Sequence, residues 1–244
     1  MFRELLLRQP AAFAPALASA VHNRALRLAS SGQRNEALNA AQEAVSRYRD
    51  LSAVRPDAFD VELATALNTL GNRLADLHMH IPAYNAAVEA VALRRKLASR
   101  RAGLPDVGLA GSLHNLALRC TVASRPAAEA LEAAQDAVAL WRQLARLDDA
   151  VGVEADLVSA VINAGQCLAD AGKRDDAIDA FDEALERATT LERRGATAAA
   201  AVLRDEAQRR RDGVVVMRGR NARDEAGMLT TDGSTKRGGC CAIT

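Results

Sequence analysis

An internal repeat of 46–48 residues is the feature that most constrains how this 244-residue chain can fold. Residues 66–77 contain the clearest copy, and three other segments match it at nearly constant spacing. Aligning the small residues Ala25, Gly71, Ala117 and Gly165 gives separations of 46, 46 and 48 residues. The same alignment places Leu28, Leu74, Cys120 and Leu168 in one apolar column. A period of this length indicates stacked structural units, each burying its apolar face against its neighbours.

The second half of each repeat has columns of its own. They are acidic (Glu43, Glu89, Asp136, Glu183), alanine (Ala44, Ala90, Ala137, Ala184) and leucine (Leu51, Leu97, Leu144, Leu191). Their spacings of 46, 47 and 47 residues support the same register. Leucine seven residues after alanine returns to the same helix face after two turns, and alanine lets two helices approach closely. With only 3% aromatic residues, the composition also favours closely packed helices, so we predict an all-α fold.

The columns divide the chain into four segments. Residues 14–195 hold four repeats, each a helix A, a break and a helix B. Residues 1–13 match the end of a helix B 46 residues later, so we expect them to be the end of a preceding, truncated repeat of a longer array. We expect a capping helix at 196–211. Residues 212–244 are rich in glycine and polar residues, which predicts a disordered tail.

The bulk composition excludes several function classes. A formal net charge of +1 gives no field strong enough to favour binding to nucleic acid. The four cysteines form no spacing typical of a disulfide framework, which favours a reducing, cytoplasmic location. His78 and His80 have no third ligand nearby, so we predict no metal site. We find no catalytic constellation, and we expect a protein that is not an enzyme and has no cofactor.

The repeat pattern resembles that of the tetratricopeptide repeat (TPR) family over residues 2–211. Helix A has a small residue at its eighth position, and helix B carries a paired acid and alanine. Residues 113–117, Leu-His-Asn-Leu-Ala, resemble the Leu-Asn-Asn-Leu-Ala signature of the extended, kinesin-light-chain-like subtype. The resemblance implies an α-solenoid, a right-handed superhelix of antiparallel helix pairs. It also implies that the A helices line a concave groove that binds a peptide or protein segment.

Polar side chains recur on the A helices at the positions that would face this groove. The predicted groove residues are His22, Asn23, Arg27, Asn68, Thr69, Arg73, His114, Asn115, Arg119 and Asn163. Asparagine can both donate to and accept from a peptide backbone, and arginine would add affinity for carboxylate or phosphate. The alternative is that these side chains bond neighbouring helices or form a solvated face. The Lys and Asn of the family's chaperone-binding carboxylate clamp are absent, which disfavours binding of chaperone C-termini.

The chain ends in a motif typical of prenylated proteins. Residues 241–244, Cys-Ala-Ile-Thr, are a cysteine, two aliphatic residues and a final residue, as in a CaaX box. We predict prenylation of Cys241, with Cys240 as a candidate palmitoylation site and Lys236 and Arg237 as a basic second signal. This would make the protein peripheral to a membrane. The alternative is a chance cysteine near the end of a free tail.

Together these patterns predict a non-enzymatic adaptor that binds a protein or peptide partner in its concave groove. Tethering to a membrane by a lipidated tail is a further hypothesis. The alternative is a fragment of a larger TPR-containing protein. In that case the repeats would serve as the assembly module of a nucleotide-binding or enzymatic multidomain protein.

Overall fold

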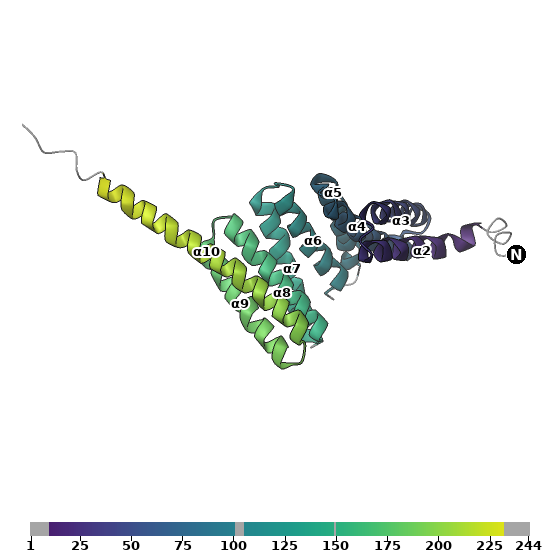
Figure 1. Ribbon diagram of the computed structural model, residues 1–244. Helices are drawn as coiled ribbons and strands as arrows, with labels where there is room; N and C mark the ends of the chain where they lie inside the picture. The colour runs from purple at the N-terminus through teal and green to yellow at the C-terminus, as the bar shows by residue number, and fades with distance from the viewer. Residues whose placement is uncertain (1–9, 101–104, 149, 232–244) are drawn as a thin grey trace, which may run out of the picture.

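The chain folds into a row of helices (Figure 1). The computed structural model describes residues 10–100, 105–148 and 150–231. The helices are α2 (Pro10–Ser30), α3 (Arg34–Val54), α4 (Pro56–Asp76), α5 (His80–Ser99), α6 (Val107–Val122), α7 (Ala127–Leu147), α8 (Val151–Asp170), α9 (Arg174–Arg193) and α10 (Thr197–Thr231). Within the described residues no strand occurs, and the predicted all-α class is confirmed.

The packing order makes the row a solenoid. Each helix packs on the next one along the chain, so α2, α4, α6 and α8 are the A helices and α3, α5, α7 and α9 are the B helices. Successive A helices also contact one another, whereas in the described part of the chain no two successive B helices make a backbone contact. The A helices therefore lie on the inner, concave side of the array. The predicted α-solenoid is confirmed.

One kind of turn separates helix A from helix B in all four repeats. A residue with positive φ ends each A helix: Gly32 (φ 76°), His78 (φ 58°), Ser124 (φ 53°) and Gly172 (φ 78°). The backbone N–H of the residue after it bonds back to a carbonyl of the A helix at 2.9–3.0 Å. The glycines favour this turn intrinsically because they lack a Cβ atom. His78 and Ser124 adopt the same conformation although each carries a Cβ atom.

The small-residue column lies where helix A meets helix B, but it is constrained differently from repeat to repeat. Ala25 and Ala117 are fully buried. A Cβ atom on Gly71 would lie 3.4 Å from the Ala83 carbonyl oxygen, an ordinary contact. A Cβ atom on Gly165 would lie only 2.8 Å from Cε1 of Phe181. Glycine is therefore required at 165, and alanine fits at 71.

We expect opposite effects from the same substitution at these two positions. Gly165→Ala should lower the free energy of unfolding by about 2 kcal/mol, because the new methyl group overpacks the buried ring of Phe181. Gly71→Ala should raise it by up to about 1 kcal/mol, since alanine has the higher helix propensity. Urea denaturation followed by circular dichroism measures both changes, and each variant is the control of the other. Equal destabilisation of the two variants would contradict the assigned contacts.

The C-terminal boundary differs from the one predicted. The last helix does not end at 211: α10 continues to Thr231, and the helix projects beyond the array (Figure 1). Its continuation past residue 212 has a physical reason, since Val214 is 7% exposed and belongs to the main apolar core. Arg211 also pairs with Asp182 of α9, with Nε 2.5 Å from Oδ1. Residues 1–9 and 232–244, including Lys236, Arg237, Cys240 and Cys241, lie outside the described residues.

Among the helices that the structure describes, none combines the length and apolar character needed to cross a membrane.

Candidate functional site

The predicted groove residues all lie on the A helices but differ in exposure. Asn23 and Arg27 on α2 are exposed. Thr69 on α4 and Asn163 on α8 are buried, with exposed fractions of 7% and 5%. The half-buried residues are His22, Asn68, Arg73, His114, Asn115 and Arg119. The polar residues therefore do not form a uniformly open ladder along the array.

Several of these side chains bond within the array. Asn68 of α4 donates from Nδ2 to the Ser112 hydroxyl of α6 at 2.8 Å. Arg119 of α6 donates to Oδ1 of Asn72 on α4 at 3.0 Å. Arg73 pairs with Asp76 one turn further along α4. These contacts fit the alternative in which the side chains bond neighbouring helices, and ligand binding by Asn68 and Arg119 stays a prediction.

Other polar atoms on the same helices are buried without any hydrogen-bond partner. They include Nδ1 of His22, Nδ1 of His114, Oδ1 of Asn68 and Nδ2 of Asn163. Burial lowers the pKa of His22, and burial together with the nearby Arg119 guanidinium lowers the pKa of His114 to about 4. His114 is therefore neutral at pH 7. A buried polar atom without a partner costs stability, so a ligand group that reached these atoms would recover that cost.

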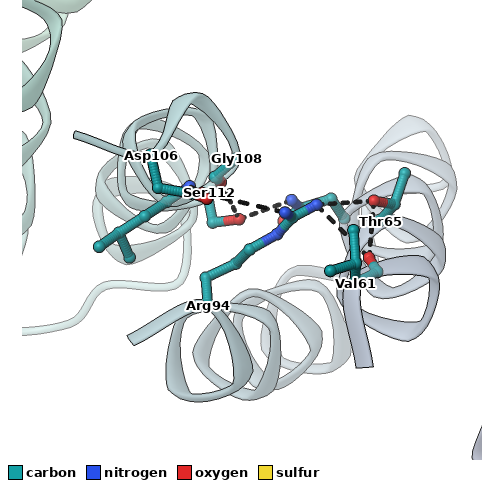
Figure 2. A network of polar contacts seen from close by, with 8 residues as sticks. Val61, Thr65, Arg94, Asp106, Gly108 and Ser112 are labelled. Atoms are coloured by element: carbon teal, nitrogen blue, oxygen red, sulfur yellow. Dashed lines mark hydrogen bonds and ion pairs between the residues drawn. The ribbon is translucent and has the colours of Figure 1, made fainter. Parts of the chain in front are cut away.

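Between α4 and α6, an arginine side chain from the B helix α5 occupies the space between the two A helices. Arg94 of α5 donates to the Thr65 hydroxyl at 2.8 Å and lies 3.9 Å from the Asp106 carboxylate (Figure 2). Asp106 caps α6 by accepting a hydrogen bond from the Leu109 N–H at 2.7 Å. A Cβ atom on Gly108 would collide with the Arg94 guanidinium, so this glycine makes room for it. No repeat column of the sequence signals this network.

Between α6 and α8, the equivalent place is open. Trp141 lies 47 residues after Arg94 and takes its position in the next repeat, and Gly111 stands where the preceding repeat has Thr65. A pocket of about 320 Å³ results, lined by Val107, Gly111, His114, Asn115, Trp141, Asp156 and Ser159. Desolvation raises the pKa of Asp156. We call this hollow the α6–α8 pocket, and it brings the predicted residues His114 and Asn115 together with three polar or aromatic residues that sequence reasoning missed.

A second hollow lies on α2, the first described helix. Its volume is about 430 Å³, and it is lined by Ala20, Asn23, Arg24, Arg27, Leu28 and Ser31. It brings together the predicted residues Asn23 and Arg27. The first hollow lies between α6 and α8 and the second on α2 and the turn after it, so the predicted residues divide into separate local sites.

Comparison with solved structures identifies the fold. A putative kinesin light chain from Podosopora anserina with nearly identical TPR-like repeats matches with a TM-score of 0.57 at 16% identity, covering 85% of this chain and 97% of that chain. BtubC (BKLC) from P. vanneervenii matches with a TM-score of 0.55 at 18% identity, covering 99% of this chain and 91% of that chain. The fold is a TPR-like α-solenoid. The predicted likeness to TPR proteins is thereby confirmed at the level of the fold.

A further match is a Rap protein, whose structure was solved in complex with competence and sporulation factor. It has a TM-score of 0.55 at 16% identity, and the match covers 80% of this chain and 53% of that chain. No protein-family model and no curated protein matches the sequence. At these identities the likeness extends to the TPR-like architecture, and the kinesin-light-chain-like subtype stays a prediction.

Proposed function

We propose that this TPR-like chain is a non-enzymatic scaffold that binds an extended peptide or protein segment along the concave face of its A helices. The observation that carries the proposal is the set of buried, unpartnered polar atoms on α2, α4, α6 and α8, to which His22, Asn68, His114 and Asn163 contribute. An extended segment presents alternating N–H and C=O groups, which can bond these atoms once the side chains that carry them turn towards the groove.

The α6–α8 pocket supports the same proposal. It is a preformed hollow on the concave face, and a side chain of an extended segment could enter it. The Rap protein, which was crystallised with competence and sporulation factor, is an example of a similar fold in complex with a ligand. The partner proposed here is therefore a peptide or a protein segment.

A selection experiment tests this function. Random dodecapeptides displayed on phage are selected on the immobilised full-length chain, and the affinity of an enriched peptide is measured by fluorescence anisotropy. We expect Gly111→Leu to weaken binding at least about tenfold, or about 1.4 kcal/mol, because the new side chain fills the groove. The fold should tolerate this change, since a Cβ atom on Gly111 meets nothing within 4 Å.

Ala139→Leu is the matched control, because Ala139 is exposed on α7 and lines a hollow on the outer, B-helix side of the array. It should leave the affinity unchanged. Failure to enrich any peptide, or loss of binding in Ala139→Leu instead of Gly111→Leu, would overturn the proposal.

Membrane tethering is a separate hypothesis. It depends on lipidation of Cys241, and on palmitoylation of Cys240, in a segment outside the described residues. Cytoplasmic location and a role as the assembly module of a larger protein likewise remain proposals from the sequence.

A further inference from the structure

We propose that the α6–α8 pocket binds a basic side chain, in particular the guanidinium of an arginine, carried by the segment that occupies the concave groove. This inference rests on the proposed function, because it names the residue type that the groove recognises at one position of the bound segment. It goes beyond that function in assigning the chemistry of one subsite.

The charges around the pocket leave one carboxylate uncompensated. Asp156 supplies the only carboxylate of the lining, and His114, the other titratable side chain there, is neutral at pH 7. Glu154, on the same helix, is already paired with Arg187 at 2.7 Å. Arg119, which lies near His114, donates to Asn72 on the far side of α6. Among the described residues, Asp156 has no ion-pair partner, so a cation that enters the pocket meets a free carboxylate.

The other lining groups suit a planar donor. Asn115 and Ser159 can accept hydrogen bonds. Trp141 contributes an indole to the wall, and guanidinium groups stack on indole faces with cation–π attraction. A guanidinium has five N–H donors in one plane and can satisfy several of these acceptors at once. Its fork also pairs with a carboxylate such as that of Asp156.

The preceding repeat interface already contains a guanidinium at the equivalent place. There Arg94 extends from the B helix between α4 and α6, next to Gly108 (Figure 2). One repeat later, Trp141 replaces Arg94, and Asp156 stands 48 residues after Gly108, at the position next to which that guanidinium lies. Across the four repeats this position holds Tyr48, Arg94, Trp141 and Ala188, so an internal cation occurs only at the α4–α6 interface. At the α6–α8 interface the carboxylate of Asp156 stands beside the pocket instead, and an arginine from outside would supply the cation there.

The chain contains a single tryptophan, Trp141, so its fluorescence reports on the pocket directly. The full-length chain is titrated with N-acetyl-arginine amide and, in parallel, with N-acetyl-citrulline amide, which has nearly the same shape but no charge. We expect a saturable change in fluorescence with the arginine amide and at least about tenfold weaker binding of the citrulline amide.

Asp156→Asn should weaken binding of the arginine amide about tenfold, because it removes the charge and keeps the shape. Asp179→Asn is the matched control, since Asp179 is an exposed carboxylate on α9 outside the pocket lining. The Asp179→Asn variant should bind the arginine amide with the same affinity as the unaltered chain. Thermal melting of both variants checks that they are folded.

The proposal is overturned if the arginine amide gives no saturable change, if the citrulline amide binds equally well, or if Asp156→Asn binds like the unaltered chain. These experiments also distinguish failure of the arginine subsite from failure of the proposed function. Enriched peptides that lack a basic residue but are blocked by Gly111→Leu would leave groove binding intact and remove this subsite. Binding of the arginine amide without enrichment of any peptide would support the subsite and count against the scaffold function.

Discussion

Phe181→Ala is expected to lower the free energy of unfolding by about 3–5 kcal/mol, the largest effect of any substitution considered for this chain. Phe181 on α9 is fully buried and is the largest of the fully buried side chains. The other repeats have alanine at the equivalent positions 41, 87 and 134. The fourth repeat accommodates the ring because the facing α8 residue is Gly165. Truncation would therefore leave a cavity with small residues on both sides and no neighbour able to fill it.

Chemical denaturation followed by circular dichroism measures the loss. Phe59→Ala provides the comparison, because Phe59 is only half-buried and stacks against the exposed Arg55. Phe59→Ala should lower the free energy of unfolding by less than half as much as Phe181→Ala. A double-mutant cycle adds a sharper test: Gly165→Ala should be less harmful in a Phe181→Leu background, since the new methyl group then occupies vacated space. Equal costs for the two alanine substitutions at 181 and 59 would contradict the packing described for the fourth repeat.

The repeat register could be predicted from the sequence because helix packing places the same demand on every repeat. The alanine column, including Ala44 and Ala137, is buried because the helices approach closely there, and that requirement recurs at a fixed spacing. The turns after α4 and α6 were harder to predict in detail. His78 and Ser124 have positive φ without the glycine that signals it, and the same backbone hydrogen bond to the A helix closes these turns as in the other two repeats.

The end of the array illustrates a limit of composition as a guide. Glycines such as Gly213 suggested a disordered tail from residue 212, but α10 continues to Thr231. Burial of Val214 and the pair between Arg211 and Asp182 outweigh the low helix propensity of one glycine. Such long-range contacts have no local sequence signal.

The candidate site was predicted only in part for a related reason. His114 and Asn115 lie on the helix face that the periodicity indicates, and they do line the α6–α8 pocket. Trp141 and Asp156 were missed because the pocket arises from a difference between repeats. The only signal is the column Tyr48, Arg94, Trp141 and Ala188, in which the residue type changes at every repeat. A search for similarity between repeats overlooks such exchanges.

Lowering the pH should destabilise this protein through His114. Burial, with help from the Arg119 guanidinium, lowers the pKa of His114 from 6.5 to about 4. The folded chain therefore favours the neutral ring, and the stability that this preference contributes is fully present above pH 6.5. As the pH falls towards 4, the unfolded chain takes up a proton that the folded chain does not. The resulting loss is on the order of 3 kcal/mol and is complete below pH 4.

Denaturation midpoints at pH 7 and pH 5 measure most of this effect. His114→Gln should reduce the loss between these two pH values, because glutamine has no proton to gain. His78→Gln, at an exposed turn, is the matched control and should retain the pH dependence of the unaltered chain. If His114→Gln loses as much stability as the control, then burial does not hold the ring neutral. Since the ring stays neutral in the folded chain at pH 5, peptide affinity should change less than stability over this range, which separates the role of His114 in the pocket from its role in the fold.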